Sequence, residues 1–363
     1  QKKISVENTT TSDGIKRKSR KKCMITIKDM AEIAGVSPTT VANVLHGRTK
    51  KMSKETLKKV QDVIDQSHYV SNMGARVLAN YGSRIIGVIM NYDRRAENNA
   101  MADPFYGTIV GALEKEIREH GYYMMLYMAG SVEETVRLAS SWNIEGLVAL
   151  GCRAEDVQKM KEQLKMPVVF IDSYFENQDC YNVGLDDFGG GYMMTNYLIR
   201  QGHRRIAFLA DQQEPAGVDR ERLLGYQKAL EENGIIFHER DYVPISFRKQ
   251  TRHTRLWEFC QERLNEYTAL FFASDFYASD AVFIFQSQGI RVPQDISVVG
   301  FDDNLFAEHC RPMLTTVQQH VADKAFYAFA LLQRLIRGEE CIEKNIHLPV
   351  KLVIRESVQP LES

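Results

Sequence analysis

The 363-residue sequence has no long hydrophobic run, because its longest apolar stretches are five to seven residues. A transmembrane helix needs roughly 20 consecutive apolar residues, so we expect no membrane-spanning helix. The composition, 44% hydrophobic and 26% charged, also excludes a disordered or fibrous protein. No basic segment followed by an apolar one begins the chain, so we expect no secretory signal and a cytoplasmic location.

Cysteine is sparse and scattered. The six cysteines, at positions 23, 152, 180, 260, 310 and 341, form no CxxC pair and have no His partner at metal-ligand spacing. Thiols flanked by apolar residues are typical of small core side chains in a reducing compartment. The sequence therefore predicts neither a disulfide framework nor a metal site.

Catalytic motifs are missing as well. The sequence has no GxSxG elbow, no HExxH and no P-loop, and the three glycines at 189–191 belong to no GxGxxG fingerprint. Two acidic pairs, Asp186 with Asp187 and Asp302 with Asp303, are candidates for acid–base chemistry or metal binding, and structural hydrogen bonding is the alternative that we favour. We therefore expect a protein that is not an enzyme and has no cofactor.

Charge is unevenly distributed, although the formal net charge is only -1. Residues 1–83 contain 16 Lys or Arg and 7 Asp or Glu, whereas the rest of the chain is acidic. A basic end on an acidic body predicts an arm that meets a polyanion. Residues 24–83 hold only 8 basic and 5 acidic side chains. Much of the excess therefore lies in residues 1–23, which we expect to form a disordered tail.

Segment 24–70 has the pattern of three short helices. Apolar residues recur at helical spacing in TIKDMAEIAGVSPTTVANVLHG, and Gly35 interrupts the first helix. Ser37 followed by Pro38 predicts the start of a second helix, because serine caps a helix and proline fits its first turn. A third helix is expected from about Ser53 to Gln66. This layout is typical of a helix-turn-helix, although any three-helix bundle fits the spacing alone.

The join at 71–83 is ambiguous. Asn72 can cap one short helix that holds Ala75 and Leu78, but Gly74 weakens such a helix by up to ~1 kcal/mol. A helix of about eight residues is not stable alone in water, so it forms only against a partner. A flexible linker is the alternative.

The pattern changes from Arg84 onward. About nine short apolar runs, from RIIGVIM at 84–90 to SVVGF at 297–301, alternate with amphipathic helical stretches. Apolar runs without alternation predict strands buried on both faces, hence parallel sheets covered by helices. About nine expected strands are too many for one sheet of this kind. We therefore expect an α/β core of two doubly wound parallel-sheet lobes, with a ligand in the crevice at the strand carboxyl ends.

Taken in order, these segments resemble the LacI/GalR family of bacterial transcription regulators. The resemblance extends from Met24 to Ser357 and rests on eleven pieces, among them TIKDMAEIAGVS, DPFYGTIVGALEKEIREHGY, YLIRQGHRRIAFLA and GIRVPQDISVVGFDD. It implies an N-terminal all-α helix-turn-helix domain, a hinge helix and a periplasmic-binding-protein-like core that forms a homodimer. It also implies a repressor of double-stranded operator DNA, controlled by a small effector, a sugar or sugar derivative, bound between the lobes.

On this resemblance we assign residues 24–70 to the helix-turn-helix domain and 71–83 to the hinge helix. The N-terminal lobe of the core is expected from residues 84–184 and 316–342, and the C-terminal lobe from residues 185–315 and 343–363. The loop between Met90 and Pro104 is longer than the usual family connection. It either reshapes the ligand entrance or packs at the dimer face.

The resemblance implies that the helix from Pro38 to about His46 enters the major groove. Where the family commonly has Ser-Arg, this chain has Ala42 and Asn43, and an asparagine suits adenine rather than guanine. We therefore predict an operator that departs from the common half-site opposite Asn43, unless Asn43 only solvates a helix face. The expected DNA contacts are Thr26, Ser37, Pro38, Thr39, Thr40, Asn43 and His46, with Asn72, Ala75 and Leu78 in the hinge.

Leu78 occupies the family position whose side chain wedges between central base pairs from the minor groove. Such an apolar wedge unstacks a base step and kinks the duplex. In a dimer the two hinge helices would pack against each other, and each would supply the contact that the other needs to be stable. By spacing alone, Leu78 fits an ordinary core leucine.

The resemblance also implies an effector site built from both lobes. Arg222 matches a family arginine that grips polar ligand groups, because a guanidinium fork suits hydroxyls or a carboxylate. Asp275 matches an acidic residue that accepts ligand protons, and Phe247 an aromatic that stacks on a ring. Surface ions and core aromatics are the ordinary alternatives. The expected set is Phe105, Tyr106 and Asp172 from the first lobe, with Arg222, Phe247 and Asp275 from the second.

Two other classes share parts of this pattern. A solute-binding protein has the same two-lobe body, but the N-terminal helical segment opposes it. A nucleotide-linked α/β enzyme is opposed by the missing phosphate loops.

We expect the ligand to close the lobes of a dimer and thereby shift the hinge helices between order and disorder.

Overall fold

The computed structural model describes residues 25–45, 48–49, 52–67, 82–91, 101, 103–174 and 179–361. The chain divides into two compact units, Gln1–Asn80 and Tyr81–Ser363. The tail 1–23, residues 68–70 at the end of the predicted helix-turn-helix domain, residues 71–81 of the predicted hinge and residues 92–100 lie outside the described part. The same is true of His46, Asn72, Ala75 and Leu78, whose expected DNA contacts stay predictions.

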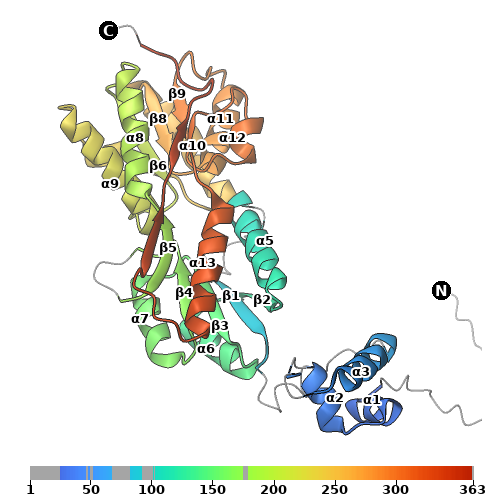
Figure 1. The fold of residues 1–363 in the computed structure, drawn as a ribbon. Helices are drawn as coiled ribbons and strands as arrows, with labels where there is room; N and C mark the ends of the chain where they lie inside the picture. Colours follow the sequence, from blue (N-terminus) through green and yellow to red (C-terminus); the bar gives the residue numbers. More distant parts are fainter. Residues whose placement is uncertain are drawn as a thin grey trace, which may run out of the picture. The chain divides into compact units, whose positions relative to one another are not determined.

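The smaller unit contains the three predicted helices, α1 (Ile27–Ala34), α2 (Pro38–Leu45) and α3 (Lys54–Ser67) (Figure 1). α1 begins with a capping box, in which Thr26 Oγ1 accepts from the Asp29 N–H and the Asp29 carboxylate accepts from the Thr26 N–H at 2.8 Å. Gly35, with a φ of +67°, ends α1 in the left-handed conformation that glycine tolerates. The core consists of Met30, Ala31, Val41, Val44 and Val60.

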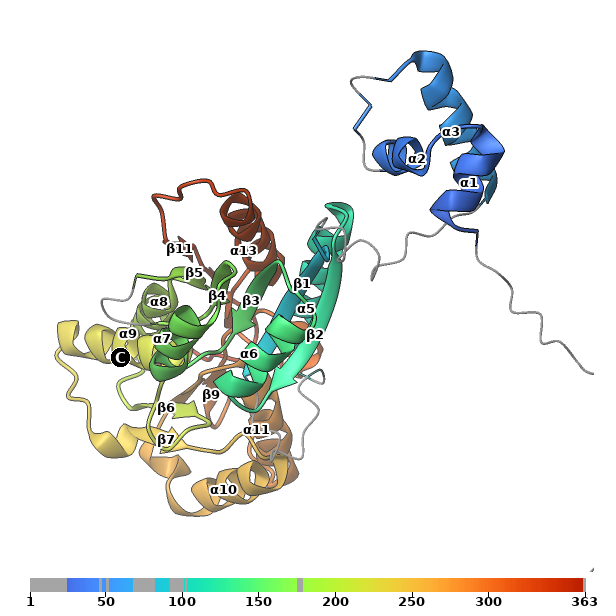
Figure 2. The same cartoon turned by 90° about the horizontal axis from the view of Figure 1, so that it is seen from below.

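The first lobe of the larger unit is a six-stranded parallel sheet in the order β11-β5-β4-β3-β1-β2. Its strands are β1 (Ile85–Asn91), β2 (Tyr123–Ala129), β3 (Gly146–Leu150), β4 (Val168–Ile171), β5 (Tyr181–Leu185) and β11 (Asn345–Leu348). All five residues of β3 are buried, as expected of a strand covered on both faces. The helices of this lobe are α5 (Pro104–Glu119), α6 (Val132–Ser141), α7 (Ala154–Gln163) and α13 (Val321–Ile336). Figure 2 shows α13 on one face of the sheet and α6 and α7 on the other.

The second lobe is a four-stranded parallel sheet in the order β7-β6-β8-β9. Its strands are β6 (Ile206–Ala210), β7 (Tyr242–Pro244), β8 (Ala269–Phe272) and β9 (Ser297–Val299). Its helices are α8 (Asp187–Arg200), α9 (Gly217–Glu232), α10 (Lys249–Glu262), α11 (Asp275–Ser287) and α12 (Leu305–His309), with short 3-10 turns at Glu239–Asp241 and Leu264–Glu266. The nine apolar runs seen in the sequence coincide with β1 to β9, and the prediction of two doubly wound lobes is confirmed.

The chain passes between the lobes three times. The first passage is from β5 into α8. The second uses β10 (Thr316–Gln318), which leads into α13, and the third uses β12 (Lys351–Val353), the antiparallel partner of β10. One expected boundary needs correction: β11 lies within the segment 343–363 that we assigned to the second lobe, yet it pairs with β5 in the first sheet. β5 pairs with β4 along one edge, and β11 pairs with the other edge of β5.

Gly191 and Gly225 allow two helices to pack closely. A Cβ atom on Gly191 would lie 2.1 Å from the carbonyl oxygen of Arg222, and one on Gly225 would lie 2.0 Å from that of Phe188. α8 and α9 therefore touch backbone to backbone, and glycine at these positions serves packing rather than phosphate binding.

Candidate functional site

The second helix of the small unit, α2, has the features of a DNA-reading helix. Ser37 Oγ accepts from the Thr40 N–H at 3.1 Å and lies 2.9 Å from Thr40 Oγ1, so Ser37 caps the helix. Val41 and Val44 are buried, whereas Thr39 is exposed and Asn43 is partly exposed. The helix thus turns its N-terminal polar side chains outward, which is the face that a major groove would receive.

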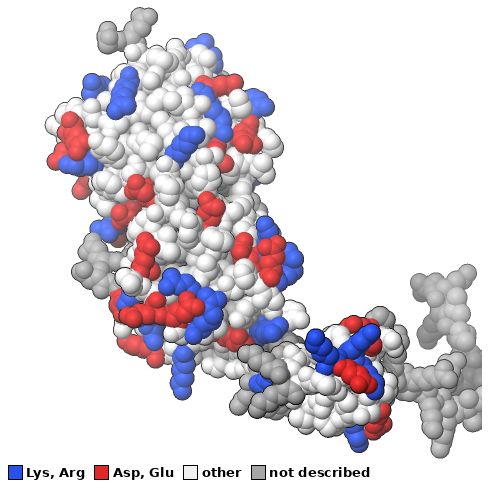
Figure 3. All heavy atoms as spheres, viewed as in Figure 1, with Lys and Arg blue, Asp and Glu red and all other residues white. Residues whose placement is uncertain are grey.

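Charge on the small unit is balanced. Its described residues include five Lys or Arg and five Asp or Glu, and Figure 3 shows both signs interspersed on the face in view. The basic excess noted in the sequence therefore belongs to residues outside the described part. The described helices of the small unit therefore carry no broad basic patch.

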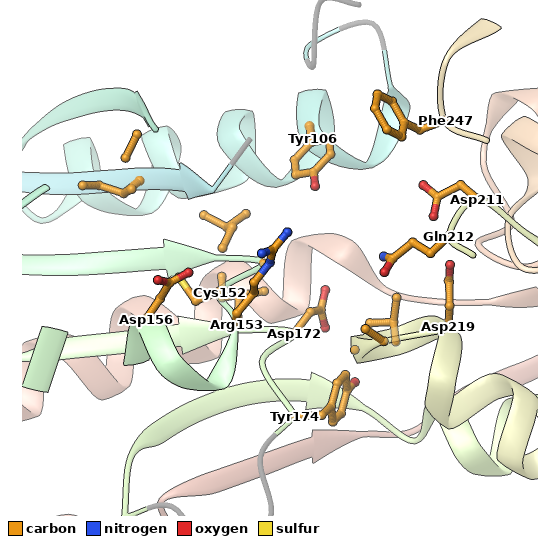
Figure 4. Close-up of a pocket in the computed structure, with 18 of the residues that line it drawn as sticks. Tyr106, Cys152, Arg153, Asp156, Asp172, Tyr174, Asp211, Gln212, Asp219 and Phe247 are labelled. Carbon is orange, nitrogen blue, oxygen red and sulfur yellow. The ribbon is translucent and has the colours of Figure 1, made fainter. Parts of the chain in front are cut away.

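The larger unit contains a cavity of about 1210 Å³ lined from both lobes. Gly151, Asp172 and Asp211, which line it, directly follow β3, β4 and β6, as expected for a ligand site at strand carboxyl ends. The lining includes five of the six expected effector residues, Phe105, Tyr106, Asp172, Arg222 and Phe247. Figure 4 shows Tyr106 and Phe247 on the side of this space opposite Tyr174.

Arg222 is held by a buried network. Its Nε donates to Asp187 Oδ1 at 2.7 Å, and its Nη1 donates to the carbonyl oxygen of Ala273 at 2.6 Å. The guanidinium lies 3.6 Å from the centre of the Phe301 ring. Tyr174 donates to the other oxygen of Asp187. The fork of Arg222 is therefore oriented in advance, and its charge is balanced by Asp187 before a ligand arrives.

Asp172 is paired across the first lobe. Lys324 Nζ, on α13, donates to both oxygens of Asp172, at 2.8 and 2.7 Å, and lies 5.0 Å from the centre of the Phe105 ring. Burial raises the pKa of the Asp172 carboxyl, and the Lys324 ammonium opposes that rise. The pair links the β4 end to the helix that carries the chain between lobes.

The expected position of Asp275 needs correction, because this residue does not line the cavity. Its Oδ2 accepts from the backbone N–H groups of Asp303 and Asn304, at 2.7 and 3.2 Å, and its Oδ1 accepts from Thr316 Oγ1 at 2.7 Å. Asp275 is fully buried. It therefore fixes the start of the second passage between the lobes instead of lining the cavity.

Most residues that line the cavity were not predicted from the sequence, among them Asp211, Asp219, Tyr277 and Gln319. Tyr277 donates to Asp211 Oδ2 at 2.7 Å. Asp219 opens α9, and burial, together with the charge of Asp211, raises its pKa to about 7. Gln319 donates to Asp302. The position of Asp211 directly after the apolar run IAFLA was the available signal, because polar residues at strand ends gather at the ligand crevice.

Among the described residues, the groups considered for catalysis have structural partners. Asp186 caps α8 by accepting from the Gly189 N–H at 2.9 Å, and Asp303 accepts from Arg355 at 2.5 Å. The prediction of structural hydrogen bonding for the two acidic pairs is confirmed. Cys152, at the cavity wall, is buried, and burial raises the pKa of its thiol to about 12, so it is not a ready nucleophile.

The described residues contain neither a metal cluster nor a membrane-spanning helix. No group of three or more His, Cys, Asp or Glu side chains is arranged to hold a metal ion in that part of the chain. No helix there is long and apolar enough to span a bilayer.

Comparison with known proteins identifies the family. Residues 26–72 match the bacterial regulatory proteins of the lacI family, and residues 195–358 match the periplasmic binding protein-like domain. The HTH-type transcriptional regulator CelR of Thermobifida fusca is 32% identical over 342 residues, which cover 92% of this chain and 98% of CelR. This chain belongs to the LacI family. It is a DNA-binding transcriptional regulator of the helix-turn-helix class.

Further relatives agree with this LacI-family assignment. The HTH-type transcriptional repressor PurR of Vibrio atlanticus (strain LGP32) is 29% identical, over 93% of this chain and 100% of that protein. The solved lac repressor dimer bound to operator and the anti-inducer ONPF has a TM-score of 0.80 at 26% identity, covering 92% of this chain and 99% of that one. The CelR–cellobiose complex has a TM-score of 0.69 at 28% identity, with the same coverage. The expected fold, a helix-turn-helix followed by a periplasmic-binding-protein-like core, is confirmed.

Proposed function

We propose that this LacI-family regulator is a repressor that binds operator DNA as a homodimer and that a sugar or sugar derivative in the cleft changes its operator affinity. The observation that carries the proposal is the cavity of about 1210 Å³ with aromatic and charged walls at the strand carboxyl ends. The solved relatives support it, because one is a repressor dimer bound to operator and ONPF and another is a complex with cellobiose. We assign the protein to the cytoplasm, with no cofactor and no enzymatic activity.

For DNA we propose that α2 lies in the major groove. Thr39 and Thr40 would contact phosphate or a thymine methyl group, and Asn43 would read adenine. Ser37 and Thr26 are helix caps here, so we assign them a supporting role beside any phosphate contact. The hinge residues that we predict to enter the minor groove, with Leu78 as the wedge, complete the interface.

For the effector we propose that Phe105, Tyr106 and Phe247 contact the apolar faces of the ligand and that Asp172 and Arg222 contact its polar groups. Asp275 acts indirectly, through the loop 302–304 that it holds. Ligand binding would favour closure of the lobes about the three passages, and the hinge helices of the dimer would respond.

Selection of an operator from random duplexes with the full chain, followed by fluorescence anisotropy, tests the DNA part of the proposal. We expect sequence-specific binding that weakens steeply with salt, because phosphate contacts release counterions. Asn43→Ala should cost about 1–3 kcal/mol and relax specificity at one base pair of each half-site. Gln66→Ala, at an exposed position on α3, is the control. Equal binding to scrambled duplexes would contradict the proposal.

Titration of sugars into the protein–operator complex tests the effector part. We expect at least one sugar to change operator affinity and Arg222→Lys to abolish that change without altering binding to DNA alone, because a lysine cannot reproduce the guanidinium fork. A solute-binding protein, the alternative function, would bind sugars but show no specific duplex binding.

A further inference from the structure

One part of the cavity wall carries hydrogen-bond acceptors that lack a donor among the described residues, although Arg220 and Arg222 also line the cavity. Three side chains carry this property, Asp211 after β6, Asp219 in the first turn of α9 and Gln319 after β10. They come from three different elements of the chain. Figure 4 shows Asp211 and Asp219 with their carboxylates directed toward the same space.

Asp211 uses only one of its two carboxylate oxygens. Oδ2 accepts from the Tyr277 hydroxyl at 2.7 Å, whereas Oδ1 is buried without a hydrogen-bond partner among the described residues. Leaving a buried carboxylate oxygen unpaired is unfavourable, because the group has lost water and gained no donor. A ligand donor at Oδ1 would remove that cost.

Gln319 gives an independent indication of the same kind. It is 7% exposed, and its Nε2 donates to Asp302, which fixes the orientation of the amide. Its Oε1 then has no donor among the described residues. A second buried acceptor therefore lies unpaired at the cavity, on a side chain whose orientation is fixed by a different contact.

Asp219 places a second carboxyl group on this wall. It is 9% exposed, and no described residue donates a hydrogen bond to its carboxylate. Asp211 and Asp219 repel each other, and Asp211 also repels Asp103 across the cavity. These carboxylates thus face one another around a shared space, and within the described part of the chain neither Asp211 nor Asp219 forms an ion pair with a cation.

Two buried cations near the cavity already have carboxylate partners. Arg222 is paired with Asp187, and Lys324 with Asp172. Arg153 enters the space from the first lobe, on the side of Cys152 and Asp156 (Figure 4). Asp211, Asp219 and Gln319 therefore need a donor from the ligand, and a positively charged donor also offsets the repulsion between the two carboxylates.

We propose that the effector is an amino sugar with an unmodified ammonium group, which lies between Asp211 and Asp219 and donates a further hydrogen bond to Gln319. This inference rests on the proposed function, since it concerns the same cleft and a ligand of the sugar class. A neutral hydroxyl supplies one donor without charge, and an acetamide supplies one donor and an additional acceptor. Only the ammonium supplies three donors and the opposite charge. The cavity volume of about 1210 Å³ accommodates a disaccharide as well as a monosaccharide.

Isothermal titration calorimetry on the full chain, with matched sets of sugars, tests this proposal. One set is D-glucosamine, D-glucose and N-acetyl-D-glucosamine, and the other is the β-linked glucosamine dimer, cellobiose and N,N′-diacetylchitobiose. We expect the amine of at least one set to bind about tenfold or more tightly than both of its neutral counterparts, since a charge pair in a partly buried site is worth more than one factor of ten. The proposal is overturned if neither amine binds, or if a neutral member binds as tightly as the amine in both sets.

Two variants locate the ammonium. Asp211→Asn and Asp219→Asn should each weaken binding of the amine about tenfold or more while changing the affinity for a neutral counterpart by less than about threefold. Asp156→Asn, which removes a carboxylate at the other end of the same space (Figure 4), is the matched control and should leave the preference for the amine intact. Equal losses from all three variants would overturn the assignment of this wall.

The result separates this inference from the proposed function. If cellobiose or another neutral sugar alters operator affinity and the amines have no advantage, the regulator is sugar-controlled and the ammonium assignment is wrong. If an amine binds the cleft tightly but operator affinity stays unchanged in anisotropy, the ammonium assignment holds and the effector role fails.

Discussion

The guanidinium of Arg252 donates through Nη1 to the backbone carbonyl oxygen of Phe247 at 2.7 Å. Arg252 is fully buried and does not line the cavity, whereas Phe247 does. Asp280 Oδ2 accepts from Nε of the arginine at 2.9 Å. Ser246, the residue before Phe247, has a φ of +82°, which is a strained value for a residue with a Cβ atom. A side chain behind the wall therefore fixes the strained turn from which the aromatic side chain projects.

Replacement of this arginine should affect stability and ligand binding together. Arg252→Met should lower the free energy of unfolding by about 3–5 kcal/mol, because it leaves Asp280 and the carbonyl oxygens of Ser246 and Phe247 without their donor. Urea denaturation measures this loss. The matched variant Phe247→Leu should weaken ligand binding with a stability change below about 1 kcal/mol, because Phe247 lies at the cavity wall. If Arg252→Met retained wild-type stability, the arginine would not hold the turn.

The buried pair of Arg222 and Asp187 should behave as a coupled unit. Arg222→Met should destabilise by about 3–5 kcal/mol, since it leaves a buried carboxylate without its cation. The double variant with Asp187→Asn should lose less than the sum of the two single variants, by about 0.5–3 kcal/mol. Urea denaturation of all four proteins gives this coupling energy. Additive losses would mean that Asp187 is held by Tyr174 rather than by the arginine.

Stability should fall with rising pH because of Asp219. Burial and the charges of Asp211 and Asp187 raise its pKa to about 7, from an ordinary value of 3.8, although Arg222 opposes the rise. The native protein therefore binds more protons between these two values. The contribution of this group to the free energy of unfolding then decreases as pH rises from about 4 to about 7. Asp219→Asn should accordingly stabilise the protein more at pH near 8 than at pH near 5, by about 1–3 kcal/mol.

A surface carboxylate provides the control for this pH effect. Arg291 holds the pKa of Asp295 at about 2, so Asp295 is ionised at both pH values. Asp295→Asn should change stability equally at pH near 5 and near 8, as measured by denaturation in matched buffers. A pH-independent effect of Asp219→Asn would show that its carboxyl titrates normally.

Close packing of α8 and α9 should make Gly191 intolerant of any side chain. Gly191→Ala places a Cβ atom 2.1 Å from a backbone oxygen of α9, so the helices must separate, at a cost of about 1–3 kcal/mol or more. Gly111→Ala, on α5, is the control, because a Cβ atom added there would meet no neighbouring atom within 4 Å. That variant should be neutral or stabilise by about 0.5–1 kcal/mol. Thermal unfolding distinguishes the two.

Repetition of simple patterns made most of the fold predictable. Each of the nine apolar runs became a strand because a run without alternation has no polar face to leave in water. The caps predicted at Ser37 and the break at Gly35 are local in sequence, and both appear as expected. β11 was misassigned because the choice of sheet for a strand near the C-terminus depends on β5, a partner far away along the chain.

The site was predictable only in part, for a related reason. Phe105, Asp172 and Arg222 lie within or beside segments that resemble a family, so their place at the cavity followed from alignment of the pattern. Asp275 lies in such a segment too, but three donors from residues 303–316 turn its carboxylate away from the cavity. Gln319 was missed because its unpaired oxygen depends on a contact with Asp302, which no linear pattern contains.

The third passage between the lobes determines how the protein tolerates shortening. The Ser357 carbonyl oxygen accepts from the Val298 N–H at 2.9 Å, and the Gln359 N–H donates to Ser297 Oγ at 3.0 Å, so the last residues bind the edge strand β9. A premature stop codon just after β11 would leave the first sheet complete and expose the edge of the second. The product would still contain α2, but its second lobe would be incomplete. A stop codon between Leu348 and Ser357 should therefore abolish regulation as fully as one near the start.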